Sequence, residues 1–473
     1  MKKTKPLSLD HTQRKAAYDI NGPVLIYAGA GAGKTRVIAA RVAMLLGKGV
    51  PPDEILCITF THKAAEEMRH RIAQYACKEI SEMWIGTFHS VCARLLRQYC
   101  DGSFTIYDGT DTNSALKRAM GAAYIDPRDY PPADLLREIS CYKRDLLSEE
   151  FIDNLKSRRG DRWVEISNKA FHGYQEELKK SNALDFDDLL MRTILLLRES
   201  QSALDSVSGR FRYVLVDEYH DTAEIESVLV NLLTARHGNL CVVADPKQAI
   251  YRFCGSDCRI AARFPEEHKG TNIHILGTNY RSSRQIVSAS ERVIQGGAEQ
   301  MPYMTTANRR EDGTVSVSHY KSDAEEFAAM AQEMLRLHNT GMAYSSMAVL
   351  CRTNDLAQSV GNTMAGHNIP YQRTNDSGFF SRREIRCIVS YLRLILNPRD
   401  DHAAEYILKT VGHRIGSRTI DILRAGGILA ACERSIKPVG ISVPAWATMQ
   451  EFHRTIIHQK GKLHNMGSPE KTE

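Results

Sequence analysis

The chain has 473 residues, which is enough for about three domains and excludes a peptide or a small disulfide-stapled protein. Hydrophobic residues make up 43% and charged residues 25%, so we expect most of the chain to fold. The formal net charge of +6 permits a polyanionic partner but is too small to argue for one. The cysteines lack paired spacing and no apolar run is long enough to span a membrane, which predicts a cytoplasmic protein without membrane contact.

The first strong pattern along the chain is a strand, a loop and a helix. Residues 23–27 (PVLIY) form a short apolar run, AGAGAGKT follows, and RVIAARVAMLL has helical spacing. Further apolar runs at 55–60, 213–216 and 240–244 alternate with helical segments. This alternation predicts an α/β fold in which helices cover both faces of a parallel sheet.

A helical insert interrupts this first α/β core. Strand patterns nearly vanish between residues 92 and 207, where Arg, Lys, Leu and Glu recur at helical spacing. We therefore assign residues 1–91 and 208–275 to the first core and residues 92–207 to the insert.

Alternation resumes after the insert. IHIL, TVSVSHY (314–320) and MAVLCRT (347–353) are strand candidates, separated by helical segments. We expect residues 276–376 to form the N-terminal part of a second core. Residues 377–473 are again mainly helical, which predicts a partial second helical insert with a polar tail.

Residues 28–35, AGAGAGKT, fit the phosphate-loop pattern with alanine in the first glycine position. Small residues let backbone N–H groups close around phosphates at a helix N-terminus, while Lys34 reaches the β and γ oxygens and Thr35 ligates Mg²⁺. A glycine-rich hinge is the alternative, but the flanking strand and helix favour a nucleoside triphosphate. The predicted nucleotide-contacting residues are Ala28, Gly29, Ala30, Gly31, Ala32, Gly33, Lys34, Thr35 and Arg36.

The run at 213–216 ends in two carboxylates, Asp217 and Glu218. Asp217 is suited to hold Mg²⁺, and Glu218 is suited to orient and deprotonate the attacking water. Adjacent carboxylates could also be a solvated turn. Given the phosphate loop upstream, the sequence favours hydrolysis.

Eight sequence blocks together resemble the UvrD/Rep/PcrA family of superfamily 1 DNA helicases, in order and approximate spacing, from about residue 8 to about residue 420. They are LDHTQRKAA, AGAGAGKTR, ITFTHKAAEEMRHR, IGTFHS, LDFDDLL, VDEYHDT, VVADPKQAIYRF and NYRSSRQIV. The resemblance implies RecA-like cores, ATP with Mg²⁺, and 3′ to 5′ movement on single-stranded DNA with unwinding of single-strand/duplex junctions.

The resemblance also implies roles for four further residues. Gln13 would read the adenine edge, Gln248 would sense the γ-phosphate, Tyr280 would stack on adenine, and Arg281 would be an arginine finger from the second core. A cation supplied across a cleft couples hydrolysis to relative motion of two cores. The alternatives are a capping box for Gln13, a core position for Tyr280 and a surface ion pair for Arg281.

By the same resemblance, four residues would line the DNA track: Phe60, Thr87, His89 and Phe253. They follow predicted strands of the first core, where loops gather along one rim. Aromatic faces stack on the bases of single strands. A lone Phe is more often a core residue, and that alternative stays open for both phenylalanines.

The sequence departs from the family at several positions and lacks two of its blocks. His220 stands where the family usually has Gln, and we find neither the His-x-x-Lys-Gly-Leu-Glu block nor the later arginine block. We therefore expect weak or no stand-alone unwinding. The second hypothesis is a truncated, unwinding-deficient module that binds ATP and DNA and acts with a protein partner supplying the missing core segments.

Overall fold

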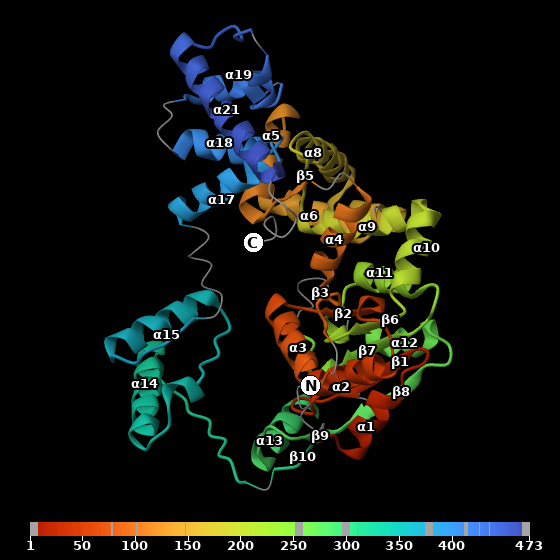
Figure 1. Cartoon of the computed structure of the whole chain (residues 1–473). Helices are drawn as coiled ribbons and strands as arrows, with labels where there is room; N and C mark the ends of the chain where they lie inside the picture. The colour runs from red at the N-terminus through yellow and green to blue at the C-terminus, as the bar shows by residue number, and fades with distance from the viewer. Residues whose placement is uncertain are drawn as a thin grey trace. The chain divides into compact units, whose positions relative to one another are not determined.

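The structure is a computed structural model that describes residues 8–76, 79–100, 103–146, 148–250, 259–295, 303–309, 311–373, 382–410, 415–424, 426–434 and 436–465. The chain forms two compact units, one of Met1–Gly313 with Ser390–Glu473 and one of Thr314–Val389. Figure 1 follows the chain through both units by colour.

A six-stranded parallel sheet is the centre of the larger unit, with strand order β3-β2-β6-β7-β1-β8. The predicted RecA-like α/β fold of the first core is therefore confirmed. The expected strand within IHIL is also present, and it pairs with β1 at the edge of this sheet. The strands are β1 (Val24–Ala28), β2 (Ile55–Thr59), β3 (Trp84–Thr87), β6 (Tyr213–Val216), β7 (Leu240–Ala244) and β8 (Asn272–Leu276).

Helices cover both faces of this sheet, because its strands are apolar on both sides. In β1, Leu25 and Tyr27 belong to one hydrophobic core and Val24 and Ile26 belong to another. Successive side chains of a strand point to opposite faces, so a doubly covered strand reads as one continuous apolar run. The surrounding helices are α1 (His11–Tyr18), α2 (Lys34–Gly47), α3 (His62–Tyr75), α4 (Phe88–Tyr99), α11 (Glu224–Thr234) and α12 (Arg259–Glu267).

Two strands lead directly into helices through side-chain caps. Thr61 accepts a hydrogen bond from the backbone N–H of Ala64 at 3.1 Å and begins α3. Thr87 and Ser90 form a capping box that begins α4. Such caps satisfy backbone donors that have no acceptor inside the helix. They fix the residues between strand and helix at the carboxyl edge of the sheet.

The predicted insert is helical, as its spacing indicates, but it also contains a two-stranded parallel ladder. Sequence patterns missed these strands because each has only two residues. The elements are β4 (Thr105–Ile106), α5 (Gly109–Ala122), α6 (Pro132–Arg144), α7 (Glu149–Arg159), α8 (Asp161–Lys180), β5 (Ala183–Leu184), α9 (Phe186–Glu199) and α10 (Gln201–Arg210).

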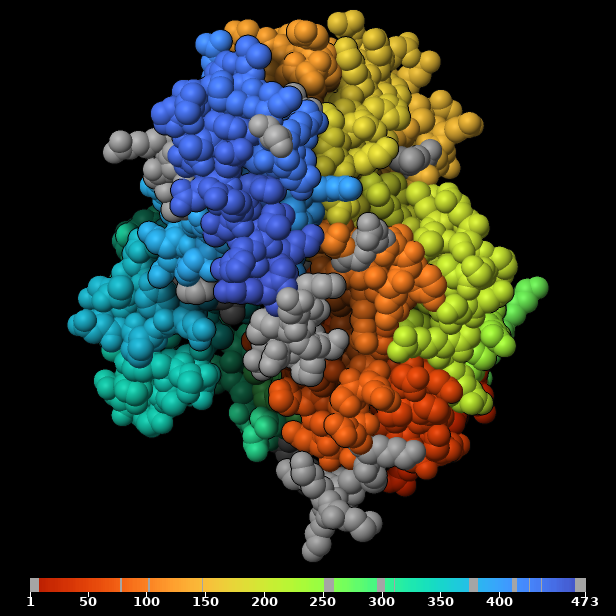
Figure 2. Space-filling view, turned by 45° about the horizontal axis from the view of Figure 1, so that its top comes forward, coloured from red at the N-terminus to blue at the C-terminus, as the bar shows by residue number. Residues whose placement is uncertain are grey.

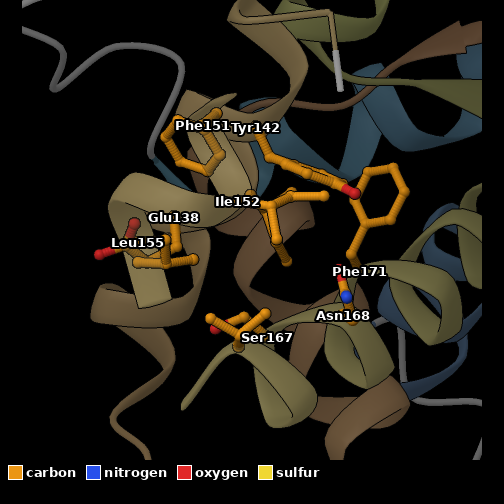
Figure 3. Close-up of a pocket in the computed structure, with 10 residues that line it drawn as sticks. Glu138, Tyr142, Phe151, Ile152, Leu155, Ser167, Asn168 and Phe171 are labelled. Atoms are coloured by element: carbon orange, nitrogen blue, oxygen red, sulfur yellow. The ribbon is translucent and has the colours of Figure 1, made fainter. Parts of the chain in front are cut away.

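A small apolar cavity lies among α6, α7 and α8 (Figure 3). Tyr142 contacts Phe151 and Phe171, with ring centroids 5.8 and 5.1 Å apart. The cavity holds about 10 Å³, which is at the lower limit for one water molecule. We interpret it as a packing gap of the insert and not as a ligand site.

The chain after residue 390, which begins within α17, packs on the insert through buried polar groups. Arg393 contacts Asp111 at 2.7 Å and Asp400 at 2.9 Å, and the Tyr107 hydroxyl donates to Asp400 at 3.0 Å. Asn397 donates to the backbone carbonyl of Ser181 at 2.9 Å. Figure 2 shows this C-terminal segment in blue beside the orange and yellow insert. The helices are α17 (Arg383–Leu396), α18 (Asp401–Thr410), α19 (Ser417–Arg424), α20 (Ala430–Glu433) and α21 (Val443–Asn465).

Between β8 and residue 313 the larger unit contains β9 (Thr278–Asn279), α13 (Arg284–Gln295) and β10 (Thr306–Ala307). Strands β9 and β10 pair in parallel. The structure therefore groups these residues with the first sheet, whereas the sequence assigned them to a second core; the domain boundaries stay a prediction.

The smaller unit is built on α14 (Asp323–Asn339) and α15 (Asn354–Gly366), with Ala331, Val360 and Met364 in their shared core. The strands expected at 314–320 and 347–353 are absent from the structure. Alternating side chains give a segment two faces, but a strand also needs a neighbour that supplies backbone hydrogen bonds in register. Among all the described residues, no helix is both long and apolar enough to cross a membrane.

The insert depends on one buried cation. Lys143 is fully buried and lies 2.6 Å from Asp185 and 2.9 Å from Asp188. We predict that Lys143→Met lowers the free energy of unfolding by about 3–5 kcal/mol, because both carboxylates lose their counter-charge in the interior. Urea unfolding followed by circular dichroism measures this loss.

The matched control is Lys156→Met, whose ion pair with Asp161 is largely exposed. We expect that variant to lose less than about 1 kcal/mol. Equal losses in the two variants would show that the buried cluster has no special role.

Candidate nucleotide and nucleic-acid site

The candidate site follows the carboxyl edge of the six-stranded sheet. The phosphate loop comes after β1, Asp245 after the adjacent β7, and Asp217 after β6. Strands β2 and β3 continue the same edge and are followed by Phe60 and His89. Loops at the carboxyl ends of parallel strands lie together, so one edge brings together the predicted nucleotide and DNA residues.

The phosphate loop needs glycine at two positions. Gly31 and Gly33 have φ angles of +67° and +87°, a left-handed conformation that side chains disfavour. A Cβ at Gly31 would also lie 2.8 Å from the Cβ of Arg281. Helix α2 begins at Lys34, and its first backbone N–H groups have no acceptor within the helix. Loop and helix end together fit a phosphate group.

Lys34 connects the phosphate loop to the acidic strand end. Its ammonium lies 2.8 Å from a carboxylate oxygen of Glu218 and 3.8 Å from Asp245. The side chain of Lys34 is only 11% exposed, so water screens this charge weakly. Phosphate oxygens would therefore compete with Glu218 for the ammonium.

Asp217 and Glu218 have different environments although they are adjacent. Burial, and then the charge of Glu218, raise the pKa of Asp217 to about 7. A buried carboxylate with so little compensation fits a divalent cation, and the hydroxyl of Thr35 on α2 is a second suitable oxygen ligand. Glu218 has the left-handed backbone φ of 53°, which is uncommon for a side-chain-bearing residue and often marks functional positions.

Gln13 has the predicted capping-box geometry and a further contact. Its backbone N–H donates to Asp10 at 2.8 Å, and its side-chain oxygen accepts from the Asp10 backbone at 3.1 Å. Its amide nitrogen also donates to the carbonyl of Ala32 in the phosphate loop at 2.9 Å. The capping alternative is therefore present in the structure, and the adenine role stays a prediction.

Tyr280 and Arg281 lie against the phosphate loop. The backbone N–H of Tyr280 donates to the carbonyl of Gly31 at 3.0 Å, and its hydroxyl hydrogen-bonds Asp10. Tyr280 is 36% exposed, so it is not a core residue. Asn279 donates to the carbonyl of Ala30 at 2.7 Å and accepts from the backbone of Arg281 at 2.8 Å. The stacking and arginine-finger roles stay predictions.

Gln248 and His220 both contact Asp245, on which sequence reasoning placed no role. The Gln248 amide hydrogen-bonds the Asp245 carboxylate, and the Asp245 backbone N–H donates to Nδ1 of His220 at 2.9 Å. Burial, and then Lys34, lower the pKa of His220 to about 3. The imidazole is therefore neutral with its proton on Nε2, which lies 3.7 Å from Glu218.

The predicted DNA residues are in part exposed and in part used by the fold. Phe60 is 37% exposed, whereas Thr87 is buried and caps α4. His89 packs edge-on against Phe186, with ring centroids 5.6 Å apart. Phe253 lies outside the described residues. All four roles in DNA binding stay predictions.

Phe186 was not predicted as a site residue, although it lies within the block LDFDDLL. Phe186 is 50% exposed at the first position of α9, directly after the capping residue Asp185. A large aromatic residue at the exposed start of a capped helix was the available signal. Its contact with His89 could not be found from sequence, because the two residues lie on helices far apart in the chain.

The strand, phosphate loop and helix, together with an acidic strand end in the same parallel sheet, define a P-loop nucleotide-binding protein. The profile of the UvrD/REP helicase N-terminal domain matches residues 9–269, and that of the UvrD-like helicase C-terminal domain matches residues 274–431. The chain belongs to the UvrD/REP helicase family.

Curated relatives of this chain include two proteins named ATP-dependent DNA helicase PcrA. The protein from Staphylococcus epidermidis is 36% identical over 423 residues, which cover 88% of this chain and 57% of the relative. The protein from Staphylococcus aureus is 34% identical over 418 residues, which cover 86% of this chain and 56% of the relative. The chain thus spans a little more than half the length of these relatives. These comparisons do not support the alternative of a truncated module.

The buried neutral His220 makes stability depend on pH. The pKa of His220 is about 3 in the folded chain against an ordinary 6.5. Above pH 6.5 the imidazole is neutral in both states and does not lower the free energy of unfolding. Below pH 6.5 only the unfolded chain binds the proton, so the free energy of unfolding falls. Between pH 7 and pH 5, we expect the free energy of unfolding to fall by about 2 kcal/mol less in His220→Gln than in the unchanged chain, because Gln binds no proton. Urea unfolding of both proteins at the two pH values gives this difference. An identical pH dependence in both proteins would contradict the buried neutral imidazole.

Proposed function

We propose that the chain is an ATP-dependent DNA helicase or translocase that hydrolyses ATP with Mg²⁺ and moves 3′ to 5′ on single-stranded DNA. One observation carries the proposal: the phosphate loop, the Asp217–Glu218 pair and the exposed aromatic residue Phe60 follow strands β1, β6 and β2 at one edge of a single sheet. The direction of movement and the action on single-strand/duplex junctions follow from the family.

The hydrolytic step needs a base, cations and an aligned water. Glu218 takes a proton as water attacks the γ-phosphorus and the bond to the β-γ bridging oxygen breaks, which leaves ADP and phosphate. Lys34 binds the phosphate oxygens and at the same time leaves Glu218 free to act. The Cβ of Arg281 lies against Gly31 of the phosphate loop, and its guanidinium would add positive charge at the phosphates. Thr35 and Asp217 would hold Mg²⁺, which neutralises charge on the phosphates.

The proposal also explains why DNA and nucleotide would affect one another. Strand β6, which carries Asp217, pairs directly with β2, which leads to Phe60. The backbone N–H of Asp217 donates to the carbonyl of Ile58 in β2 at 2.9 Å. A movement of the loop after β2, on binding of DNA to Phe60, would therefore displace Asp217 and Glu218 through the hydrogen bonds between β2 and β6.

Two measurements on the purified chain test this function. ATP hydrolysis is measured with and without single-stranded DNA, and translocation is measured by displacement of streptavidin from oligonucleotides biotinylated at either end. We expect stimulation by DNA and faster displacement from the 5′ end. Hydrolysis that DNA leaves unchanged would contradict the coupling, and faster displacement from the 3′ end would contradict the direction.

Lys34→Ala and Glu218→Gln separate binding from turnover. We expect Lys34→Ala to weaken ATP binding by about 1.5–3 kcal/mol, because a charge-assisted hydrogen bond is lost. Glu218→Gln should keep binding and lower turnover by about 10²- to 10⁴-fold, because only the base is lost. Calorimetric titration of ATP and steady-state hydrolysis measure the two effects. Normal turnover in Glu218→Gln would exclude Glu218 as the base.

Phe186→Ala tests the nucleic-acid part of the edge. We expect weaker binding of single-stranded DNA by about 1–3 kcal/mol, because a base would lose its stacking surface. Tyr124→Ala is the control, since Tyr124 is also an exposed aromatic residue, 96% exposed on the insert. Fluorescence anisotropy with a labelled oligonucleotide measures both. Equal effects of the two substitutions would remove Phe186 from the DNA track.

A further inference from the structure

A buried ion pair links the loop after β7 to helix α13. The ammonium of Lys247 lies 2.6 Å from a carboxylate oxygen of Glu291, and the two side chains are only 6% and 11% exposed. Lys247 directly precedes Gln248, the predicted γ-phosphate sensor, in the 3₁₀ turn Pro246–Gln248. Glu291 lies in α13, the helix that follows Arg281.

Neighbouring groups hold this pair in one arrangement. The backbone N–H of Thr305 donates to the same oxygen of Glu291 at 3.2 Å, and Lys247 lies 4.5 Å from the centroid of the Tyr303 ring. The Tyr303 hydroxyl donates in turn to Asp245. Burial alone would raise the pKa of Glu291, but the hydrogen bonds from Lys247 and Thr305 hold it below its usual range. Glu291 is therefore ionised, and the contact is a true ion pair.

The same cluster touches the phosphate loop. A Cβ at Gly29 would lie 3.0 Å from the hydroxyl oxygen of Thr305 and 3.2 Å from the Tyr303 ring. Helix α13 begins at Arg284, three residues after Arg281, and Glu291 lies about two turns further along it. The contact between Lys247 and Glu291 thus holds α13 in place relative to the phosphate loop, against which Arg281 lies.

We propose that Lys247 and Glu291 are positioning residues that hold α13, and with it Arg281, in register with the sensor loop around Gln248. The inference rests on the proposed ATPase function. A buried charge pair tolerates little displacement, because separation leaves two charges in a poorly screened interior. Movement of Gln248 during the hydrolytic cycle is therefore passed to α13 and moves Arg281.

The kinetic test compares Lys247→Met and Glu291→Gln with the unchanged chain. We expect kcat of DNA-stimulated ATP hydrolysis to fall by about tenfold to a hundredfold while KM for ATP changes little, because a misplaced arginine affects the transition state more than the ground state. Glu291→Asp keeps the charge and should recover part of the loss. Lys409→Met is the control, since Lys409 on α18 is 48% exposed and pairs with Glu405 at the same 2.6 Å separation.

A second background separates positioning from plain stabilisation. In an Arg281→Lys chain, whose finger is already impaired, Lys247→Met should cause little further loss of kcat. A full, multiplicative loss in that background would overturn the proposal, as would an unchanged kcat in folded Lys247→Met and Glu291→Gln. A purely structural role would instead lower the melting temperature and leave kcat of the folded fraction unchanged.

Hydrogen exchange tests the same pair without reference to turnover. Amides of Arg284–Gln295 should exchange faster in Lys247→Met and Glu291→Gln, while those of Lys34–Gly47 in α2 stay unchanged. If the unchanged chain does not hydrolyse ATP, the proposed function fails. Hydrogen exchange alone then tests whether Lys247 and Glu291 hold α13 in place. Unchanged exchange in α13 would then overturn the proposal for this pair.

Discussion

Burial of both faces of the five strands β1, β2, β3, β6 and β7 of the central sheet determines where this protein can carry out chemistry, since only the edge strand β8 leaves part of one face exposed. Every strand from β1 to β7 of that sheet is apolar and buried along its length, so no charged group can act from either face. In these five strands polar residues are confined to the ends, whereas the edge strand β8 carries the buried His274 at its centre, 2.8 Å from Asp19. Because all six strands are parallel, their carboxyl ends meet on one edge, and the candidate residues lie together there although they are far apart in sequence.

Charges at this edge are close together and weakly screened, so each strongly affects the protonation or the ion pairing of its neighbours. Asp217 has a raised pKa, His220 a lowered one, and Lys34 is shared between Glu218 and Asp245. Such an arrangement stores electrostatic cost, which bound phosphate and a divalent cation would relieve. It follows that ligand binding would rearrange hydrogen bonds across several strands at once.

Local spacing allowed the phosphate loop, the Asp217–Glu218 pair and five of the six strands of the first sheet to be located from sequence, whereas β3 (Trp84–Thr87) was not among the predicted strands. Each of these features is encoded within a few consecutive residues. The ion pair between Lys247 and Glu291 joins residues 44 positions apart, and no local pattern marks it. The strands expected at 314–320 and 347–353 fail for a related reason, because pairing depends on a neighbour and not on alternation alone.

The polar contacts between the insert and the C-terminal helices have a consequence for the connectivity of the chain. The smaller unit leaves the larger one at Gly313 and returns at Ser390, so both of its ends are held by the same body. Arg393 and Asn397 anchor the returning end to the insert. A protease cut within the smaller unit would therefore yield two fragments that remain bound to each other through the larger unit, although no peptide bond joins them.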